Sequence, residues 1–169
     1  MPARSYGIAM WRRVADHPEL LLGHMGGPFW ERKDAAAWSI PKGLADEGED
    51  PIDAAIREFA EELGIAFPGD RADLVELGEF RQSSSKLVVA WSFDASGLTV
   101  APFGSEHPAG VELPGVVSNT FELEWPPRSG RLRSFPEIDR AAWFDLATAR
   151  EKCVRGQIDL VEILARSIE

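Results

Sequence analysis

Three glutamates crowd one short segment of the sequence at a spacing that suits a metal site. Glu58, Glu61 and Glu62 stand at positions i, i+3 and i+4, so a helix would carry them on one face. Like charges this close repel one another, and a bound cation would turn that repulsion into attraction. Carboxylate oxygens are hard ligands, which favours Mg²⁺ or Mn²⁺ over Zn²⁺. Such a cluster alone is more often a solvated acidic surface, so the residues around it must distinguish a metal site from such a surface.

The segment that carries these glutamates has the signals of a helix over residues 50–63. Asp50 suits the N-cap, Pro51 the first helical position, and Gly64 the position after the last turn. Apolar residues at helical spacing predict a stripe that faces the core, made of Ile52, Ile56, Phe59 and Leu63. The three carboxylates are left together beside that stripe.

Two further residues suit the same site. Arg57 lies four residues before Glu61, so it can pair with Glu61 or with Glu49 and fix the orientation of a carboxylate. Gly43 can bring a backbone carbonyl close to the same metal, because it has no side chain in the way.

Residues 43–65 resemble the Nudix box, in which conserved glycines, glutamates and one arginine stand at fixed spacing around a helix. Every fixed position is filled here, by Gly43, Glu49, Arg57, Glu58, Phe59, Glu61, Glu62, Gly64 and Ile65. The resemblance implies an α/β class protein with the Nudix fold, an α/β/α sandwich with a mixed β-sheet. A length of 169 residues suits one domain, and we expect residues 1–169 to form it.

The resemblance also implies an activity. Nudix enzymes use Mg²⁺ or Mn²⁺ to hydrolyse a phosphoanhydride bond in a nucleoside diphosphate linked to another group. The implied metal ligands are Glu58, Glu61 and Glu62, with the carbonyl of Gly43 as a further one. Arg57 would form an ion pair with Glu49 inside the box.

The general base of this implied reaction is left open by the sequence. Glu58 is one choice. Glu137 is the other, because residues 136–139 precede an apolar segment in a way that resembles a common family pattern of a glutamate before the last strand. Glu137 is about as well explained as an ordinary surface residue.

Residues outside the box are candidates for binding the substrate. Residues 38–43 resemble the lead-in to the box of diadenosine tetraphosphate hydrolases, which implies a dinucleoside polyphosphate as substrate. We expect Lys42 and Lys86 to contact phosphate, and Gln82 and Trp38 to contribute to the site. A nucleoside triphosphate or a nucleotide sugar remains an alternative substrate, and a non-catalytic nucleotide sensor or interaction module is the alternative from another class.

The composition narrows the partners. The formal net charge is −10, which argues against nucleic acid because phosphate backbones are repelled. The single cysteine, Cys153, cannot form an internal disulfide and is expected to be a packed thiol. No apolar run is long enough to span a bilayer, so we expect a cytoplasmic protein that binds a small nucleotide and no membrane. A homodimer stays open.

The elements that must position these residues alternate irregularly along the chain. Strands are predicted at residues 6–11, 19–23, 38–41, 74–80, 86–93 and 140–144, and helices at residues 146–153 and 157–168. This order indicates a mixed sheet covered by helices and argues against a Rossmann sheet or a barrel. Residues 95–133 are difficult to interpret, with one extended segment expected at residues 116–124.

Overall fold

A long hairpin begins the fold of the computed structural model, which describes residues 1–169. Its strands are β1 (Ala3–Val14) and β2 (His17–Met25). They pair only beside their turn, from Trp11 opposite Leu20 to Val14 opposite His17. The turn residues Ala15 and Asp16 have φ angles of 49° and 67°, the left-handed conformation that tight hairpin turns require. Beyond Trp11 the two strands no longer pair with each other.

Residues 38–44 fill the fork between these two strands. β3 (Trp38–Ser39) pairs with β2, and β4 (Lys42–Leu44) pairs with β1. The N–H of Ile8 donates to the carbonyl of Pro41 at 3.2 Å. A Cβ on Gly7 would lie 2.7 Å from that same carbonyl oxygen, so a side chain at position 7 would push the inserted segment out of the fork. The lack of a side chain at Gly7 therefore helps to place the start of the Nudix-like box.

The remaining strands make the sheet mixed, as predicted. β6 (Lys86–Asp94) lies parallel to β1, and β5 (Val75–Ser83) lies antiparallel outside β6. β9 (Ile138–Asp145) lies antiparallel to β2 on the other side of the sheet. Each strand predicted from the sequence is present, most of them with longer ends than expected.

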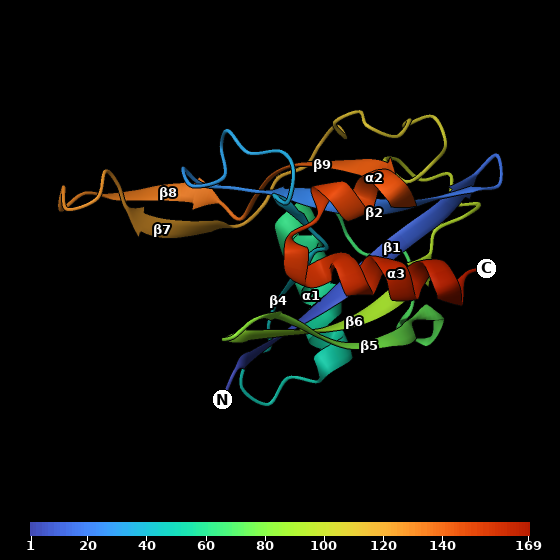
Figure 1. Ribbon diagram of the computed structural model, residues 1–169, viewed down its shortest axis with the longest axis horizontal. Helices are drawn as coiled ribbons and strands as arrows, with labels where there is room; N and C mark the ends of the chain where they lie inside the picture. The colour runs from blue at the N-terminus through green and yellow to red at the C-terminus, as the bar shows by residue number, and fades with distance from the viewer.

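Helices cover both faces of this sheet (Figure 1). α1 (Pro51–Leu63) covers one face, where Phe59 and Leu63 pack with Ile8, Met10 and Trp143. α2 (Leu146–Lys152) and α3 (Ile158–Ser167) cover the other face, where they pack with a second set of strand residues that includes Ala9, Leu20, Leu22 and Val88. Successive strand residues thus point into two separate cores on opposite faces of the sheet. The predicted α/β/α sandwich is confirmed. The structure also contains two short 3₁₀ helices, η1 (Arg71–Asp73) and η2 (Arg155–Gln157).

The ends of α1 are the ones predicted. The Asp50 carboxylate accepts hydrogen bonds from the N–H groups of Ile52 and Asp53 at 2.9 and 3.3 Å. Gly64 ends the helix with a φ of 70°, and its N–H donates to the carbonyl of Ala60. The buried face differs from the predicted stripe, because Ala54 and Ala55 are fully buried while Ile52 and Ile56 are only half-buried.

Cys153 follows α2 and is buried, as predicted for a packed thiol. Burial raises its pKa to about 11, which keeps it in the unreactive protonated form. No helix of the structure is long and apolar enough to cross a bilayer.

Residues 95–136, most of which were difficult to interpret from the sequence, contain a separate two-stranded ribbon and an anchored loop. β7 (Thr120–Glu124) and β8 (Leu132–Pro136) pair antiparallel as a two-stranded sheet of their own. This ribbon projects from the body of the protein (Figure 1). The extended segment expected at residues 116–124 is present only in part, and β8 was not predicted.

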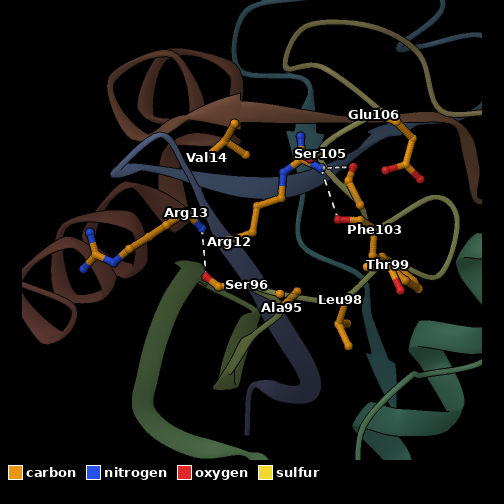
Figure 2. A pocket seen from close by; sticks show the side chains of 12 residues that line it. Arg12, Arg13, Val14, Ala95, Ser96, Leu98, Thr99, Phe103, Ser105 and Glu106 are labelled. Carbon is orange, nitrogen blue, oxygen red and sulfur yellow. Dashed lines mark hydrogen bonds between the residues drawn. The ribbon is translucent and has the colours of Figure 1, made fainter.

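Arg12 anchors the loop that follows β6 (Figure 2). Its side chain is buried and pairs with Glu19 at 2.8 Å. The same guanidinium donates to the carbonyls of Phe103 and Gly104 at 3.1 and 2.7 Å, and also to the carbonyl of His107. It lies over the Trp143 ring. One buried cation therefore satisfies three loop carbonyls and one carboxylate, which ties residues 103–107 to the hairpin.

Replacement of Arg12 by Met should destabilise the protein by about 3–5 kcal/mol, because Glu19 and the loop carbonyls would lose their buried partner. Urea denaturation measures this change. Arg13→Met is the matched control, since Arg13 is exposed and should change the free energy of unfolding by about 0.5 kcal/mol or less. Equal effects of the two variants would contradict the anchoring role of Arg12.

Replacement of Gly64 by Ala should cost at least about 1 kcal/mol more than replacement of Gly48 by Ala. Both glycines have left-handed φ angles, of 70° and 75°, so both variants carry the same backbone strain. A Cβ at Gly64 would also lie 2.3 Å from the carbonyl oxygen of Val117, whereas a Cβ at Gly48 meets no atom within 4 Å. Chemical denaturation of both variants compares the two costs, and indistinguishable costs would show that the Val117 contact is not tight.

Candidate functional site

The close approach of β4 to α1 builds the centre of the site. A Cβ placed on Gly43 would lie 2.1 Å from the carboxyl carbon of Glu58. Any side chain at position 43 would therefore displace that carboxylate. Because β4 is itself fixed in the fork between β1 and β2, the backbone of Gly43 and the carboxylate of Glu58 are held against each other by the sheet.

A cleft of about 380 Å³ opens beside this contact. Its charged lining consists of Lys42, Glu58, Glu62, Lys86 and Glu137. These residues come from β4, from α1, from the start of β6 and from the turn between β8 and β9. Three carboxylates and two ammonium groups that are far apart in the sequence thus share one small concave site.

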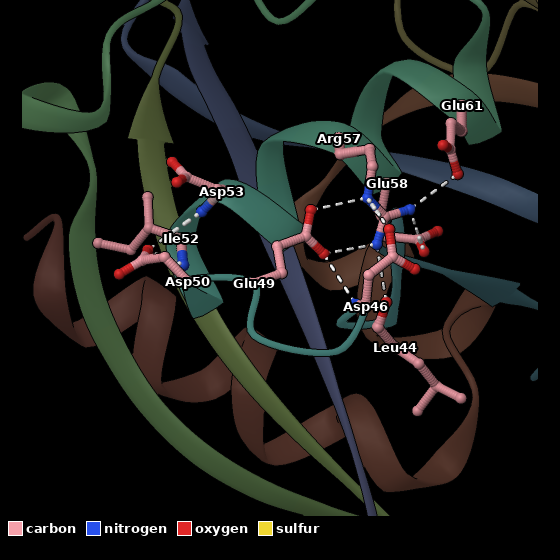
Figure 3. A network of polar contacts seen from close by, with 9 residues as sticks. All are labelled: Leu44, Asp46, Glu49, Asp50, Ile52, Asp53, Arg57, Glu58 and Glu61. Atoms are coloured by element: carbon pink, nitrogen blue, oxygen red, sulfur yellow. Dashed lines mark hydrogen bonds and ion pairs between the residues drawn. The ribbon is translucent and has the colours of Figure 1, made fainter.

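Arg57 holds the outer carboxylates of the box (Figure 3). Its guanidinium donates to both carboxylate oxygens of Glu49 at 2.9 Å, and it donates to Glu58 and Glu61 at 3.0 Å. It also donates to the carbonyl of Leu44 at 2.9 Å. These hydrogen bonds raise the pKa of Arg57 and lower the pKa of Glu49 to about 2. The pair between Arg57 and Glu49 that the resemblance implied is present in the structure.

Glu62 is the most buried carboxylate of the cleft. It is 9% exposed, and its Oε2 accepts a hydrogen bond from the backbone N–H of Lys42 at 3.1 Å. Burial raises the pKa of Glu62 to about 8, even though the ammonium group of Lys42 acts in the opposite direction. Burial also lowers the pKa of Lys42. Both groups are thus held in an environment that disfavours their charged forms.

Glu58 and Glu137 are shifted in the same direction as Glu62. Burial raises the pKa of both carboxyls. For Glu58 the guanidinium of Arg57 opposes the shift, and for Glu137 the ammonium groups of Lys42 and Lys86 oppose it. Carboxylates that are costly to ionise together favour a cation among them.

The residues present fit a divalent metal by their chemistry, although they are not arranged around one point. The structure contains no group of three or more acidic, histidine or cysteine side chains that converge as metal ligands, since Glu58 and Glu61 both turn toward Arg57. The donors are nevertheless all hard oxygens, as Mg²⁺ and Mn²⁺ prefer. The space that a Cβ of Gly43 would fill lies directly beside the Glu58 carboxylate, so a backbone carbonyl and carboxylates are at hand together.

The structure places most of the predicted site residues in this one cleft. Lys42, Gly43, Glu58, Glu62, Lys86 and Glu137 all line it. Glu61 does not line the cleft, and it pairs with Arg57 instead. Its side chain is 41% exposed.

Trp38 and Gln82, which were expected to contribute to the site, do not line this cleft. Trp38 is 4% exposed, and its indole N–H donates to Asp34 at 3.0 Å while its ring packs edge-on against Phe144. The side-chain oxygen of Gln82 accepts from Gln157 at 3.1 Å. Both side chains therefore serve packing on the face that α2 and α3 cover.

Two polar residues of the cleft lining, Ser5 and Asn119, were not predicted from the sequence. Ser5 lies on β1 beside β4, and Asn119 immediately precedes β7. Neither belongs to a motif, and only the pairing of distant segments brings them to the site. No pattern in the sequence would have identified them.

Comparison with known proteins finds relatives that are similar to part of this chain. An RNA pyrophosphohydrolase of Azorhizobium caulinodans is 37% identical over 75 residues, which are 43% of this chain and 38% of that protein. Nudix hydrolase 7 of Arabidopsis thaliana is 33% identical over 95 residues, which are 56% of this chain and 30% of that protein. The chain thus matches well under half of the length of these relatives.

Solved structures share the fold over nearly the whole chain. The Ap4A hydrolase of C. elegans has a TM-score of 0.59 at 19% identity, covering 100% of both chains. The NUDIX domain of Shewanella oneidensis NrtR, complexed with ADP ribose, has a TM-score of 0.59 at 13% identity, covering 100% of this chain and 90% of that one. A family model described as NUDIX domain matches residues 2–164. With every fixed position of the box filled and the fold in place, this chain belongs to the Nudix family.

Proposed function

We propose that this protein uses Mg²⁺ or Mn²⁺ to hydrolyse a phosphoanhydride bond in a nucleoside diphosphate linked to another group. The observation that carries the proposal is the cleft, in which Glu58, Glu62 and Glu137 face Lys42 and Lys86. Carboxylates for a metal and ammonium groups for phosphate are what such a reaction needs. The net charge of −10 makes this local pair of lysines the feature that admits an anionic substrate.

Each group of the cleft has a role in this proposal. Glu58, Glu61 and Glu62 would hold the metal together with the carbonyl of Gly43, and Arg57 orients the carboxylates of Glu58 and Glu61. A bound divalent ion supplies neutralisation of the charge that develops on phosphate oxygens when water attacks phosphorus. Lys42 and Lys86 hold the phosphates of the substrate in the cleft.

Glu137 is the better candidate for the general base. Its carboxylate makes no hydrogen bond to the protein, and burial raises its pKa, which makes it a stronger base. The Glu58 carboxylate is instead engaged by Arg57 at 3.0 Å and lies against Gly43, in the place of a metal ligand. We therefore assign proton abstraction from water to Glu137.

A dinucleoside polyphosphate is the substrate that we favour. The lead-in at residues 38–43 resembles that of diadenosine tetraphosphate hydrolases, and the fold is shared with the C. elegans Ap4A hydrolase. Nucleoside triphosphates and nucleotide sugars are the alternatives in the same class. A sensor that binds a nucleotide without hydrolysis is the alternative from another class.

The test of the metal assignment is the replacement of Glu61 or Glu62 by Gln. Each change should lower Mg²⁺-dependent kcat by about 100-fold or more, because it removes charge stabilisation from the transition state. A panel of dinucleoside polyphosphates, nucleoside triphosphates and nucleotide sugars, assayed with Mg²⁺ and with Mn²⁺, provides the measurement. Glu151→Gln, an exposed change on α2, is the control and should leave turnover unchanged.

Two outcomes of this panel would contradict the proposal. Full activity of Glu61→Gln or Glu62→Gln would remove that residue from the metal site. Tight binding of a nucleotide to the wild-type protein without any hydrolysis would replace the enzyme by the sensor.

The stability of the metal-free protein should fall as the pH rises, because of Glu62. Its pKa rises from 4.5 to about 8 on folding, so the folded chain retains a proton that the unfolded chain releases between these values. The stability that this proton contributes is full below pH 4.5 and is lost as the pH approaches about 8.

Urea denaturation in the presence of a chelator, from about pH 5 to about pH 8, measures this effect. Glu62→Gln should flatten the fall, since an amide cannot ionise, while Glu151→Gln should follow the wild-type protein. Parallel curves for wild type and Glu62→Gln would show that the carboxyl of Glu62 ionises freely in the folded state.

A further inference from the structure

Residues 117–119 run past the carboxyl end of α1 and bind its free carbonyls. The N–H of Val117 donates to the carbonyl of Leu63 at 3.0 Å, and the N–H of Asn119 donates to the carbonyl of Glu61 at 2.8 Å. The last carbonyls of a helix have no partner within the helix, so this segment completes them. The missing side chain of Gly64 leaves room for it, because a Cβ there would lie 2.3 Å from the carbonyl oxygen of Val117.

The same segment holds the turn that carries Glu137. The carbonyl of Asn119 accepts from the N–H of Glu137 at 2.9 Å, and the hydroxyl oxygen of Ser118 accepts from the N–H of Ile138 at 3.1 Å. On the other side of the turn, the N–H of Gly26 donates to the carbonyl of Glu137 at 2.9 Å. Residues 118–119 therefore connect the end of the metal-binding helix directly to the main chain of Glu137.

This connection sets where the Glu137 carboxylate lies in the cleft. That carboxylate has no hydrogen bond of its own to the protein, so its position depends on the backbone at residues 137 and 138. The hydrogen bonds that hold this backbone are made by main-chain atoms except one, which is made by the hydroxyl of Ser118. Ile138 is buried, and its N–H loses its hydrogen-bond partner if that hydroxyl is removed.

We infer that Ser118 is a positioning residue for Glu137, acting through the N–H of Ile138. The inference rests on the proposed function, in which Glu137 takes the proton from the attacking water. Ser118 does not touch the reacting atoms in this arrangement. It keeps the Glu137 turn at a fixed place relative to Glu58 and Glu62, and displacements of about 1 Å are enough to lower the rate of a positioned reaction.

The test compares Ser118→Ala with Ser118→Thr, which keeps the hydroxyl. With diadenosine tetraphosphate and Mg²⁺, Ser118→Ala should lower kcat by about five- to tenfold and leave KM within about twofold, because one hydrogen bond to a positioning turn is lost. Ser118→Thr should restore most of kcat. Ser129→Ala is the matched control, since the hydroxyl of Ser129 accepts from the N–H of Arg131 at the far end of the same ribbon, and it should change neither constant.

A double-mutant cycle separates positioning from a general structural role. In the Glu137→Gln background, Ser118→Ala should cause no further loss of kcat, because Ser118 acts only through the Glu137 carboxylate. An equal further loss in that background would overturn the inference. Unchanged kcat in Ser118→Ala alone would overturn it as well.

Amide hydrogen exchange gives a readout that does not need turnover. Exchange at Ile138 should be about tenfold faster in Ser118→Ala than in wild type, with Ser118→Thr and Ser129→Ala close to wild type. Unchanged exchange at Ile138 would show that Ser118 does not hold the turn. If exchange changes as expected but the wild-type protein hydrolyses no nucleotide, the proposed function fails while the contact stands. Full activity of Glu137→Gln would overturn the base assignment and the inference with it.

Discussion

The contact between the backbone of Gly43 and the carboxylate of Glu58 is the constraint on which the site depends. It requires β4 to fit in the fork between β1 and β2. It also requires α1 to pack closely against β4 with no side chain at position 43. Gly7 satisfies the first requirement and Gly43 the second. The cleft lies beside these close contacts, so the sheet and the helix together fix the positions of the residues that line it.

The cleft contains acidic and basic groups whose charged forms are disfavoured by burial. Burial raises the pKa values of Glu58, Glu62 and Glu137, and it lowers the pKa of Lys42. A fold maintains such a site only if the surrounding structure is stable enough to offset it. The two cores on either side of the sheet, and the buried pair of Arg12 with Glu19, provide that stability at a distance from the cleft.

The sequence predicted the parts of the structure that depend on local signals. The caps of α1, the box and the strands around them follow from residue types at short spacing. The buried face of α1 was only partly predicted, because periodicity marks large apolar residues while the tight contact with the sheet uses Ala54 and Ala55. Trp38 and Gln82 were assigned to the site by their neighbours in sequence, yet their side chains point to the other core. Residues 117–119 and β8 act through pairing with distant segments, which no local pattern contains.

Arg57 has a consequence for the order in which the protein assembles. Its guanidinium pairs with Glu49, Glu58 and Glu61, and its one positive charge offsets part of the repulsion among these three carboxylates. This pairing within the chain lowers the cost of placing acidic side chains together on the helix. Under the proposed function, metal binding would replace the Arg57 guanidinium by a cation as the positive partner of Glu58 and Glu61. On that proposal, the supply of metal would govern the activity of the protein rather than its folding.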